Sequence, residues 1–418
     1  MKNIKVPWMS WYGNAEIELT FPENWDLIVS RMKDAPDISD SEIRRAFENP
    51  IGTARISELA AGKESVAIAV DDLTRPTQAY HLMPHILEEV RAGGIKEENI
   101  QIIFAIGAHR PMMRADAIKK LGAEVVDRFS IVNHHPHENL VYLGQTSRGT
   151  PVKVNKFFAL ADLKIGVGFI SIHPLAGFGG GGKIVLPGVC GIDVLERNHT
   201  PAMAGETGGV AVIEGNEHRA DIEEAARIAG LDVIVNTVGN SLGQTAGVFV
   251  GDLVDAHRAA VQLAQQVYAT KIPQNMDIGV FNAFPKDTDF VQAVNATNVW
   301  SNRNEALVKE GGAIVVTTAS SEGRGYHCLA DRGTRLHWRI ETRAGFREIL
   351  QNRKLIFFCP NINYADLYEH YSTGTLLFRK WEDVVEELSK HYGPGSKVAV
   401  FPCSTLQFDE RKLVKRDA

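Results

Sequence analysis

Residues 166–199 read GVGFISIHPLAGFGGGGKIVLPGVCGIDVLERNH, and this stretch says most about the fold and chemistry of the chain. The apolar run Ile165–Ile172 is typical of a buried strand, and His173 follows at its carboxyl end. A glycine run then leads to Lys183, and His199 comes one short segment later. Glycine lets a backbone approach a ligand closely, at an entropic cost that a purely structural loop has little reason to bear. We therefore expect a cofactor here, held by an amine between two imidazoles.

The composition is that of an ordinary globular protein. The chain has 418 residues, 44% hydrophobic and 23% charged, which is enough for two domains with sizeable cores. A net charge of -6 argues against broad nucleic-acid binding. The four cysteines lie far apart without a CxxC pair, which favours a reducing compartment over a disulfide framework. With neither a signal-peptide core nor a membrane-span pattern, we expect a cytoplasmic protein without nucleic-acid or membrane partners.

Strand-like and helix-like segments alternate along the chain, which predicts an α/β fold with a doubly wound parallel sheet. The alternation is interrupted near Pro273 and then restarts. We predict an N-terminal α/β domain, residues 1–271, that carries the cofactor and the catalytic residues. A smaller C-terminal α/β domain, residues 272–396, would close the substrate cleft, with the active site between the two domains. The segment 397–418 could join either domain, and residues 291–309 are expected to be mainly helical.

Polar groups follow the carboxyl ends of successive predicted strands, where open parallel sheets bind ligands. Asp72 and Arg75 follow the strand at 66–70, His109 follows the strand at 100–106, and His173 follows the strand at 163–172. Arginine grips a carboxylate through two nitrogens. Histidine exchanges protons near neutral pH. Asp72 could orient a histidine or cap the next helix. Together these groups predict a site for an anionic substrate and proton transfer.

Two other motifs are weaker. The cluster His134, His135 and His137 could bind a metal, but it lacks the i, i+4 spacing of a helical zinc motif. The glycine run fits both GxGxxG and GxxxxGK, yet Ile184 follows Lys183 where a P-loop needs a hydroxyl. The run also begins five residues after the strand, too late for a dinucleotide fingerprint. What remains is a loop with a lysine that could hold a phosphate or a covalent adduct.

Taken together, these residues resemble the nickel-dependent lactate racemase family of 2-hydroxyacid racemases and epimerases. The resemblance spans most of the chain. It is carried by the segments around Asp72 and His109 and by the spacing of His173, Lys183 and His199. Further matches are at Gly215-Asn216-Glu217, Asn236, Gly251-Asp252 and Ser321-Glu322-Gly323.

The resemblance implies an isomerase that inverts the C2 centre of a 2-hydroxy acid by proton-coupled hydride transfer to a nickel-pincer nucleotide. This cofactor is a pyridinium-3,5-bisthiocarboxylic acid mononucleotide that holds nickel, and cofactor biosynthesis proteins would have to supply it. The resemblance assigns Lys183 as the tether and His199 as the nickel ligand. Whether the Lys183 link is covalent stays open. The assignments continue with cofactor contacts from Asp72, Thr74, Gly179, Gly180, Gly181 and Gly182.

By the same resemblance His109 and His173 would be paired acid/base residues on opposite faces of the substrate, and Arg75 would bind its carboxylate. One departure concerns substrate choice. The family's lactate enzymes carry a tyrosine and a lysine where this chain has Val291 and Asn295, although Gln292 is retained.

An asparagine suits hydroxyl groups better than a carboxylate. We therefore expect Gln292 and Asn295 to contact a substrate other than lactate, such as a larger or sugar acid. An unchanged preference with other loops replacing the lysine is the alternative. Two other functions stay open: an NAD-dependent 2-hydroxyacid dehydrogenase and a non-catalytic nickel-nucleotide binding protein.

Overall fold

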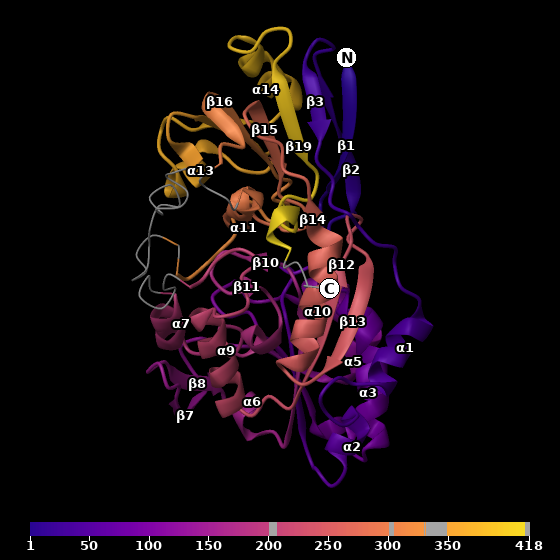
Figure 1. Ribbon diagram of the computed structural model, residues 1–418. Coiled ribbons are helices and arrows are strands. Elements are labelled where there is room, and N and C mark those ends of the chain that lie inside the picture. The colour runs from indigo at the N-terminus through magenta and orange to yellow at the C-terminus, as the bar shows by residue number, and fades with distance from the viewer. Residues whose placement is uncertain (200–206, 301–304, 330, 332–348, 414–418) are drawn as a thin grey trace. The chain divides into compact units, whose positions relative to one another are not determined.

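The computed structural model describes residues 1–199, 207–300, 305–329, 331 and 349–413 (Figure 1). The chain divides into two compact units, which we name by their place in the sequence. The central unit consists of Ala35–Asn240 and Gln244–Gln265. The terminal unit consists of Met1–Asp34, Ser241–Gly243 and Gln266–Ala418.

The central unit is built on a six-stranded sheet in the order β13-β12-β9-β4-β5-β6. Five strands are parallel, and the edge strand β13 runs antiparallel to β12. Every residue of β4 is buried, as expected when helices cover both faces of a parallel sheet. The sheet strands are β4 (Val66–Val70), β5 (Ile100–Phe104), β6 (Ser130–Asn133), β9 (Leu163–Phe169), β12 (Val233–Gly239) and β13 (Thr245–Gly251).

Two small antiparallel hairpins, β7–β8 and β10–β11, lie outside this sheet. Their strands are β7 (Leu140–Gln145), β8 (Pro151–Asn155), β10 (Ile172–His173) and β11 (Gly177–Phe178). The helices of the unit are α1 (Asp40–Glu48), α2 (Ile56–Ala60), α3 (Ala79–Ala92), α4 (Arg114–Leu121), α5 (Ala123–Arg128), α6 (Lys156–Leu160), α7 (Ile192–Asn198), α9 (Glu217–Ile228), most of α10 (Asp255–Tyr268), and the 3-10 turns η1 (Glu97–Asn99) and η2 (Gly181–Ile184). None of the described helices is long and apolar enough to cross a membrane.

The terminal unit has its own six-stranded sheet, in the order β18-β17-β16-β15-β19-β3, and all of its pairs are parallel. Its strands are β3 (Asp26–Val29), β15 (Met276–Asn282), β16 (Val308–Thr317), β17 (Lys354–Phe358), β18 (Leu376–Phe378) and β19 (Lys397–Phe401), with the pairs β1 (Lys2–Trp8)–β2 (Ala15–Phe21) and β14 (Ala269–Thr270)–β20 (Phe408–Asp409) outside it. The helices are α11 (Phe290–Ala293), α13 (Tyr364–His370), α14 (Trp381–Ser389), and the 3-10 turns η3 (Val294–Val299) and η5 (Glu410–Lys412).

This division differs from the predicted one, in which residues 1–271 form a single domain. Strand β3 near the N-terminus pairs with β19 near the C-terminus, and β19 pairs with β15. The first 34 residues and the strand at 397–401 therefore both belong to the terminal unit. The reason is a strand pairing between the two ends of the chain, which a pattern read along the sequence does not contain.

Two hydrophobic clusters cover the faces of the terminal sheet, and neighbouring residues of one strand alternate between them. Phe357 packs in the cluster with Phe281 and Phe401, while Phe358 packs in the other with Trp8 and Trp381. The Trp8 and Phe358 rings stack with centroids 5.6 Å apart. The N-terminal hairpin thus covers one sheet face together with α14.

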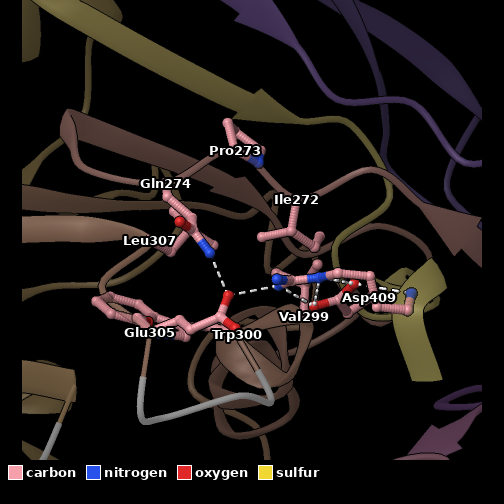
Figure 2. A pocket seen from close by; sticks show the side chains of 9 residues that line it. Ile272, Pro273, Gln274, Val299, Trp300, Glu305, Leu307 and Asp409 are labelled. Carbon is pink, nitrogen blue, oxygen red and sulfur yellow. Dashed lines mark hydrogen bonds and ion pairs between the residues drawn. The ribbon is translucent and has the colours of Figure 1, made fainter.

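The C-terminal segment is fixed to the same unit by polar contacts around the pocket in Figure 2. Arg411 pairs with Glu305 at 2.6 Å and with Asp409 at 2.5 Å. Glu305 also accepts a hydrogen bond from Gln274, and its carbonyl accepts the Trp300 indole N–H at 2.9 Å. These bonds join η5 to the segment before β16.

The mainly helical prediction for residues 291–309 holds for the first half of the range and fails at its end. Phe290–Ala293 is α-helical, a 3-10 helix follows at Val294–Val299, and β16 already begins at Val308. Asparagine side chains hydrogen-bond locally here, with Asn295 donating to the Gln292 carbonyl at 2.9 Å. Such bonds compete with the α-helical pattern. Residues 301–304 lie outside the described part.

Candidate active site

Two neighbouring parallel strands of the central unit end in polar side chains that meet. Strands β4 and β5 pair with Val70 beside Phe104. Asp72 follows the first strand and His109 the second, and Asp72 Oδ2 lies 2.7 Å from His109 Nδ1. Their side chains are 6% and 14% exposed, so both are largely shielded from water. The structure thus brings together two groups that the strand ends predicted.

The Asp72 carboxylate is held by several donors. Thr74 donates to its Oδ1 from the backbone N–H at 2.8 Å and from Oγ1 at 2.5 Å, and Arg75 donates to Thr74 Oγ1 at 2.7 Å. Burial alone would raise the pKa of Asp72. The charge of His109, its hydrogen bond and the charge of Arg75 outweigh burial and hold that pKa well below its usual range. Asp72 is therefore ionised and accepts the Nδ1 proton of His109, so the lone pair of the neutral ring is on Nε2.

A buried ion pair supports the turn between β4 and α3. The Lys120 ammonium lies 2.6 Å from Asp71, and the lysine side chain is fully buried. It also donates to the carbonyls of Asp72 at 3.0 Å and Arg75 at 2.9 Å. Burial raises the pKa of Asp71 and lowers that of Lys120. Sequence reasoning missed Lys120. Its signal was a lysine beside Leu121 on the apolar face of α4.

The glycine run is closely packed by the protein itself, which corrects the expectation that only a ligand would require it. A Cβ added at Gly180 would meet Ile170 at 2.4 Å, one at Gly181 would meet His257 at 2.9 Å, and one at Gly182 would meet Ile222 and Ala226 at 3.0 Å. Gly181 also has φ +60°, a conformation that favours glycine. Gly179 is similarly enclosed, with the Phe169 carbonyl at 3.0 Å.

Three buried side chains hydrogen-bond to the backbone of this run and of the turn before it. The sequence pointed to only one of them, Asn236. Asn236 Oδ1 accepts the Gly181 N–H at 2.7 Å. His257 Nε2 donates to the Gly179 carbonyl at 2.9 Å. Arg219 donates to the carbonyls of Ala176, Phe178 and Gly180. The loop before Lys183 therefore has a defined shape without any ligand.

His173 lies on β10, half-buried, and its ring is fixed by the following turn. The backbone N–H groups of Leu175 and Ala176 both donate to its Nδ1, at 3.2 and 3.0 Å. Nδ1 is therefore an acceptor, and the proton of the neutral ring is on Nε2.

His199 caps the C-terminus of α7 and is half-buried. Its Nδ1 donates to the Leu195 carbonyl at 2.9 Å, which places the ring's lone pair on Nε2. Histidines that bind metals are oriented in this way, with one nitrogen donating and the other facing the ion. The preceding Asn198 donates to the buried Asp221 on α9 at 3.2 Å. The end of α7 is thus tied to α9.

Lys183 and His199 belong to the same unit and lie next to the same helix. Lys183 is on η2, whose Gly182 packs on Ile222 and Ala226 of α9. The His199 ring meets His218 edge-on, with centroids 6.5 Å apart, and His218 is one turn earlier on α9.

The remaining predicted residues lie elsewhere. Gln292 and Asn295 belong to the terminal unit, on α11 and η3. The Asn295 amide donates to the Gln292 carbonyl at 2.9 Å, and its oxygen accepts from Asn298 at 3.2 Å. Both ends of this amide are thus engaged within its own turn.

Among the described residues, no three His, Cys, Asp or Glu side chains are grouped to hold a metal ion. The His134, His135 and His137 cluster therefore does not form such a group. His134 instead donates from Nε2 to the Cys190 carbonyl at 2.8 Å, and burial lowers its pKa to about 4.

The chain is similar to several known proteins of one family. The family described as the lactate racemase N-terminal domain matches residues 12–209. A lactate racemase from Thermoanaerobacterium thermosaccharolyticum is 30% identical over 333 residues, which cover 78% of this chain and 76% of that protein. A lactate racemase from Lactiplantibacillus plantarum is 32% identical over 306 residues, or 70% of each chain.

Among solved structures, the lactate racemase apoprotein from Thermoanaerobacterium thermosaccharolyticum matches with a TM-score of 0.76 and 25% identity. The match covers 97% of this chain and 99% of that chain. Sequence identity, the family match and the shared α/β fold therefore agree: the chain belongs to the lactate racemase family.

Proposed function

We propose that this protein is an isomerase that inverts the C2 stereocentre of a 2-hydroxy acid. The observation that carries the proposal is the Asp72–His109 pair at 2.7 Å. It places an imidazole with its Nε2 lone pair and a buried carboxylate partner at the carboxyl edge of a parallel sheet. Arg75 is joined to this pair through Thr74, which puts a guanidinium beside a proton acceptor. A 2-hydroxy acid needs both, one for its carboxylate and one for its hydroxyl proton.

The residues around α9 fit a nickel-pincer nucleotide. His199 would hold the nickel through Nε2, because its Nδ1 donates to the Leu195 carbonyl and this bond orients the ring. Lys183 would hold the nucleotide, either by an ion pair or by a covalent bond. The fixed backbone of the glycine loop would determine how closely the nucleotide can lie. The backbone of Gly179, Gly180, Gly181 and Gly182 would border it on one side. When bound, this group supplies an acceptor for the C2 hydrogen and its electron pair.

The protein's own groups would supply the rest of the chemistry. Nε2 of His109 takes the hydroxyl proton, and Asp72 stabilises the imidazolium that forms. Arg75 holds the substrate carboxylate. His173 would be the second acid/base residue, on the opposite face of the substrate. Removal of the C2 hydrogen as a hydride avoids a carbanion that no side chain could generate unaided.

We propose a substrate larger or richer in hydroxyl groups than lactate. The support is the sequence departure at Asn295, where a neutral amide stands in place of a cation. Gln292, buried on α11, would contribute a second amide. A panel of single-enantiomer acids, from lactate to aldonic acids, tests this point by kcat/KM. A panel in which lactate ranks first contradicts it.

The cofactor proposal is tested by intact-mass analysis and nickel quantification on chain produced with the cofactor biosynthesis proteins. We expect about one nickel per chain in the wild type, and a mass adduct if the link is covalent. His199→Ala should lose nickel, and Lys183→Ala should lose the nucleotide. His134→Ala is the matched control, since that imidazole is buried against Cys190. Full nickel and nucleotide in both site variants would refute the proposal.

A further inference from the structure

Asp221 is a carboxylate of α9 that joins three parts of the central unit. The residue has no solvent exposure. Its Oδ1 accepts the Thr146 hydroxyl at 2.6 Å, and its Oδ2 accepts the Thr150 hydroxyl at 2.9 Å. The same Oδ2 accepts the side-chain amide of Asn198 at 3.2 Å. The turn between β7 and β8, the end of α7 and the helix α9 therefore meet at one buried carboxylate (Figure 1).

Helix α7, which ends just before His199, is fixed at both of its ends. At its start, the Gly191 N–H donates to the Lys153 carbonyl of β8 at 2.9 Å. At its end, Asn198 is fully buried and donates to Asp221. Among the described residues the side-chain oxygen of Asn198 has no hydrogen-bond partner. The bond to Asp221 is therefore the polar contact that holds this side chain.

The orientation of the His199 ring depends on this end of α7. Its Nδ1 and its backbone N–H both donate to the Leu195 carbonyl at 2.9 Å, one helical turn earlier. Both bonds require that the last turn of α7 keeps its shape. The ring also lies edge-on to His218, which is three residues before Asp221 on α9. Residues that orient a metal-binding histidine affect how tightly the metal is held.

On the basis of the proposed function, we propose that Asp221 is a positioning residue for the nickel ligand. Through Asn198 it holds the last turn of α7, and this turn determines where Nε2 of His199 lies. Asp221 acts through Asn198 and is not itself a ligand. The link depends on the direction of one hydrogen bond, because a carboxylate only accepts and the amide nitrogen only donates.

Glu224, on the same helix, provides a matched control. It accepts the backbone N–H of Ser147 at 2.6 Å and the Ser147 hydroxyl at 2.7 Å, and Arg148 lies 3.5 Å away. These contacts join α9 to the same turn between β7 and β8, and none of them involves α7. The two carboxylates therefore differ in the bond to Asn198.

The link is tested first on the full-length chain without cofactor. Asn198→Asp replaces the donor with an acceptor, and adding Asp221→Asn restores a donor–acceptor pair with the opposite direction. We expect hydrogen exchange in the last turn of α7 to become on the order of tenfold faster in Asn198→Asp, the scale of one buried polar group that loses its partner. The double variant should recover most of this loss. Adding Glu224→Gln to Asn198→Asp instead should recover none.

Unchanged exchange in Asn198→Asp, or equal recovery with Glu224→Gln, would overturn the proposal. The Glu224 variant removes one negative charge from the same helix, so equal recovery would assign the effect to charge alone. Recovery by Asp221→Asn alone identifies a pairwise contact, because independent substitutions add.

The second test measures how fast the loaded enzyme loses nickel to excess EDTA, as a fraction of the nickel bound at the start. We expect loss about tenfold faster in Asn198→Asp and close to the wild-type rate after Asp221→Asn is added. Equal rates of nickel loss in all variants would overturn the proposal even if the exchange pattern is as expected. A wild type that takes up no nickel would reject the proposed function, while the exchange data would still decide whether Asp221 holds the end of α7.

Discussion

The ammonium group of Lys120 lies 2.6 Å from the carboxylate of Asp71, and the lysine side chain has no solvent exposure. This pair supports the turn that carries Asp72, because the same ammonium also donates to the Asp72 carbonyl. Lys120→Met would leave a buried carboxylate without its cation. We expect it to lower the free energy of unfolding of the central unit by about 3 kcal/mol, measured by urea denaturation.

The exposed pair of Arg128 with Glu124 provides the control. Arg128→Ala should change the same free energy by less than about 1 kcal/mol, because water screens the pair. The double variant Asp71→Leu with Lys120→Met should recover part of the loss, since both buried charges are then gone. A Lys120→Met chain as stable as the wild type would show that the pair does not support the turn.

Asp72→Asn tests the carboxylate behind His109. The amide cannot stabilise an imidazolium, and it can reverse the ring's tautomer by donating to Nδ1. We expect kcat of the loaded enzyme, calculated per bound nickel, to fall by about 100-fold or more in both directions. Glu124→Gln, an exposed carboxylate, is the control. Turnover close to the wild type would exclude Asp72 from proton transfer.

Asp287 makes the stability of the terminal unit depend on pH. It accepts the N–H groups of Met9 at 2.8 Å and Ser10 at 3.1 Å. Burial raises its pKa to about 6, against the smaller opposing effect of these hydrogen bonds. The pKa is thus higher in the folded than in the unfolded chain, where it is about 3.9. The folded state binds the proton more tightly, so this contribution to stability is complete below about pH 4 and is lost as the pH rises through about 6.

The contribution lost is on the order of 3 kcal/mol. Urea denaturation of the terminal unit across this pH range should show the decline in the wild type, and Asp287→Asn should remove most of it. An identical pH profile in the two proteins would contradict the assignment.

Gly181→Ala tests whether the protein or the ligand requires the glycine run. The added methyl would meet His257 at 2.9 Å, while the same substitution at Gly62 meets no atom within 4 Å. Both glycines have positive φ, +60° and +75°, so the backbone strain is matched. We expect Gly181→Ala to be the more destabilising of the two by about 1–3 kcal/mol in the absence of cofactor. If both variants lost the same free energy of unfolding, the side chains around Gly181 would be able to move aside for the methyl group at little cost.

Much of the central unit can be predicted from the sequence because its signals are local. The apolar runs at Val66–Val70 and Leu163–Phe169 give strands, and parallel strands bring the residues after their carboxyl ends to one edge of the sheet. The meeting of Asp72 with His109 is a consequence of this rule. The terminal unit is harder, since its sheet depends on β3 and β19 from opposite ends of the chain. No local pattern encodes that pairing.

The parts of the site that the sequence did not reveal are those set by buried polar contacts. Lys120 and Arg219 look like ordinary surface residues in the sequence, yet one is ion-paired under a turn and the other holds three carbonyls. The glycine run alone predicts a site that only a ligand would require, although its protein neighbours already fill the space that side chains would occupy. The opposite tautomers of His109 and His173 depend on which atom faces each Nδ1, and only a three-dimensional structure provides that information.

The most direct test of the account uses a single enantiomer of a 2-hydroxy acid labelled with deuterium at C2, incubated in ordinary water with the nickel-loaded enzyme. Chiral separation with mass spectrometry then tracks both configuration and label. We expect C2 to be inverted and the product to keep its deuterium, because the hydrogen leaves and returns as a hydride. Inversion with loss of the label to solvent would contradict it.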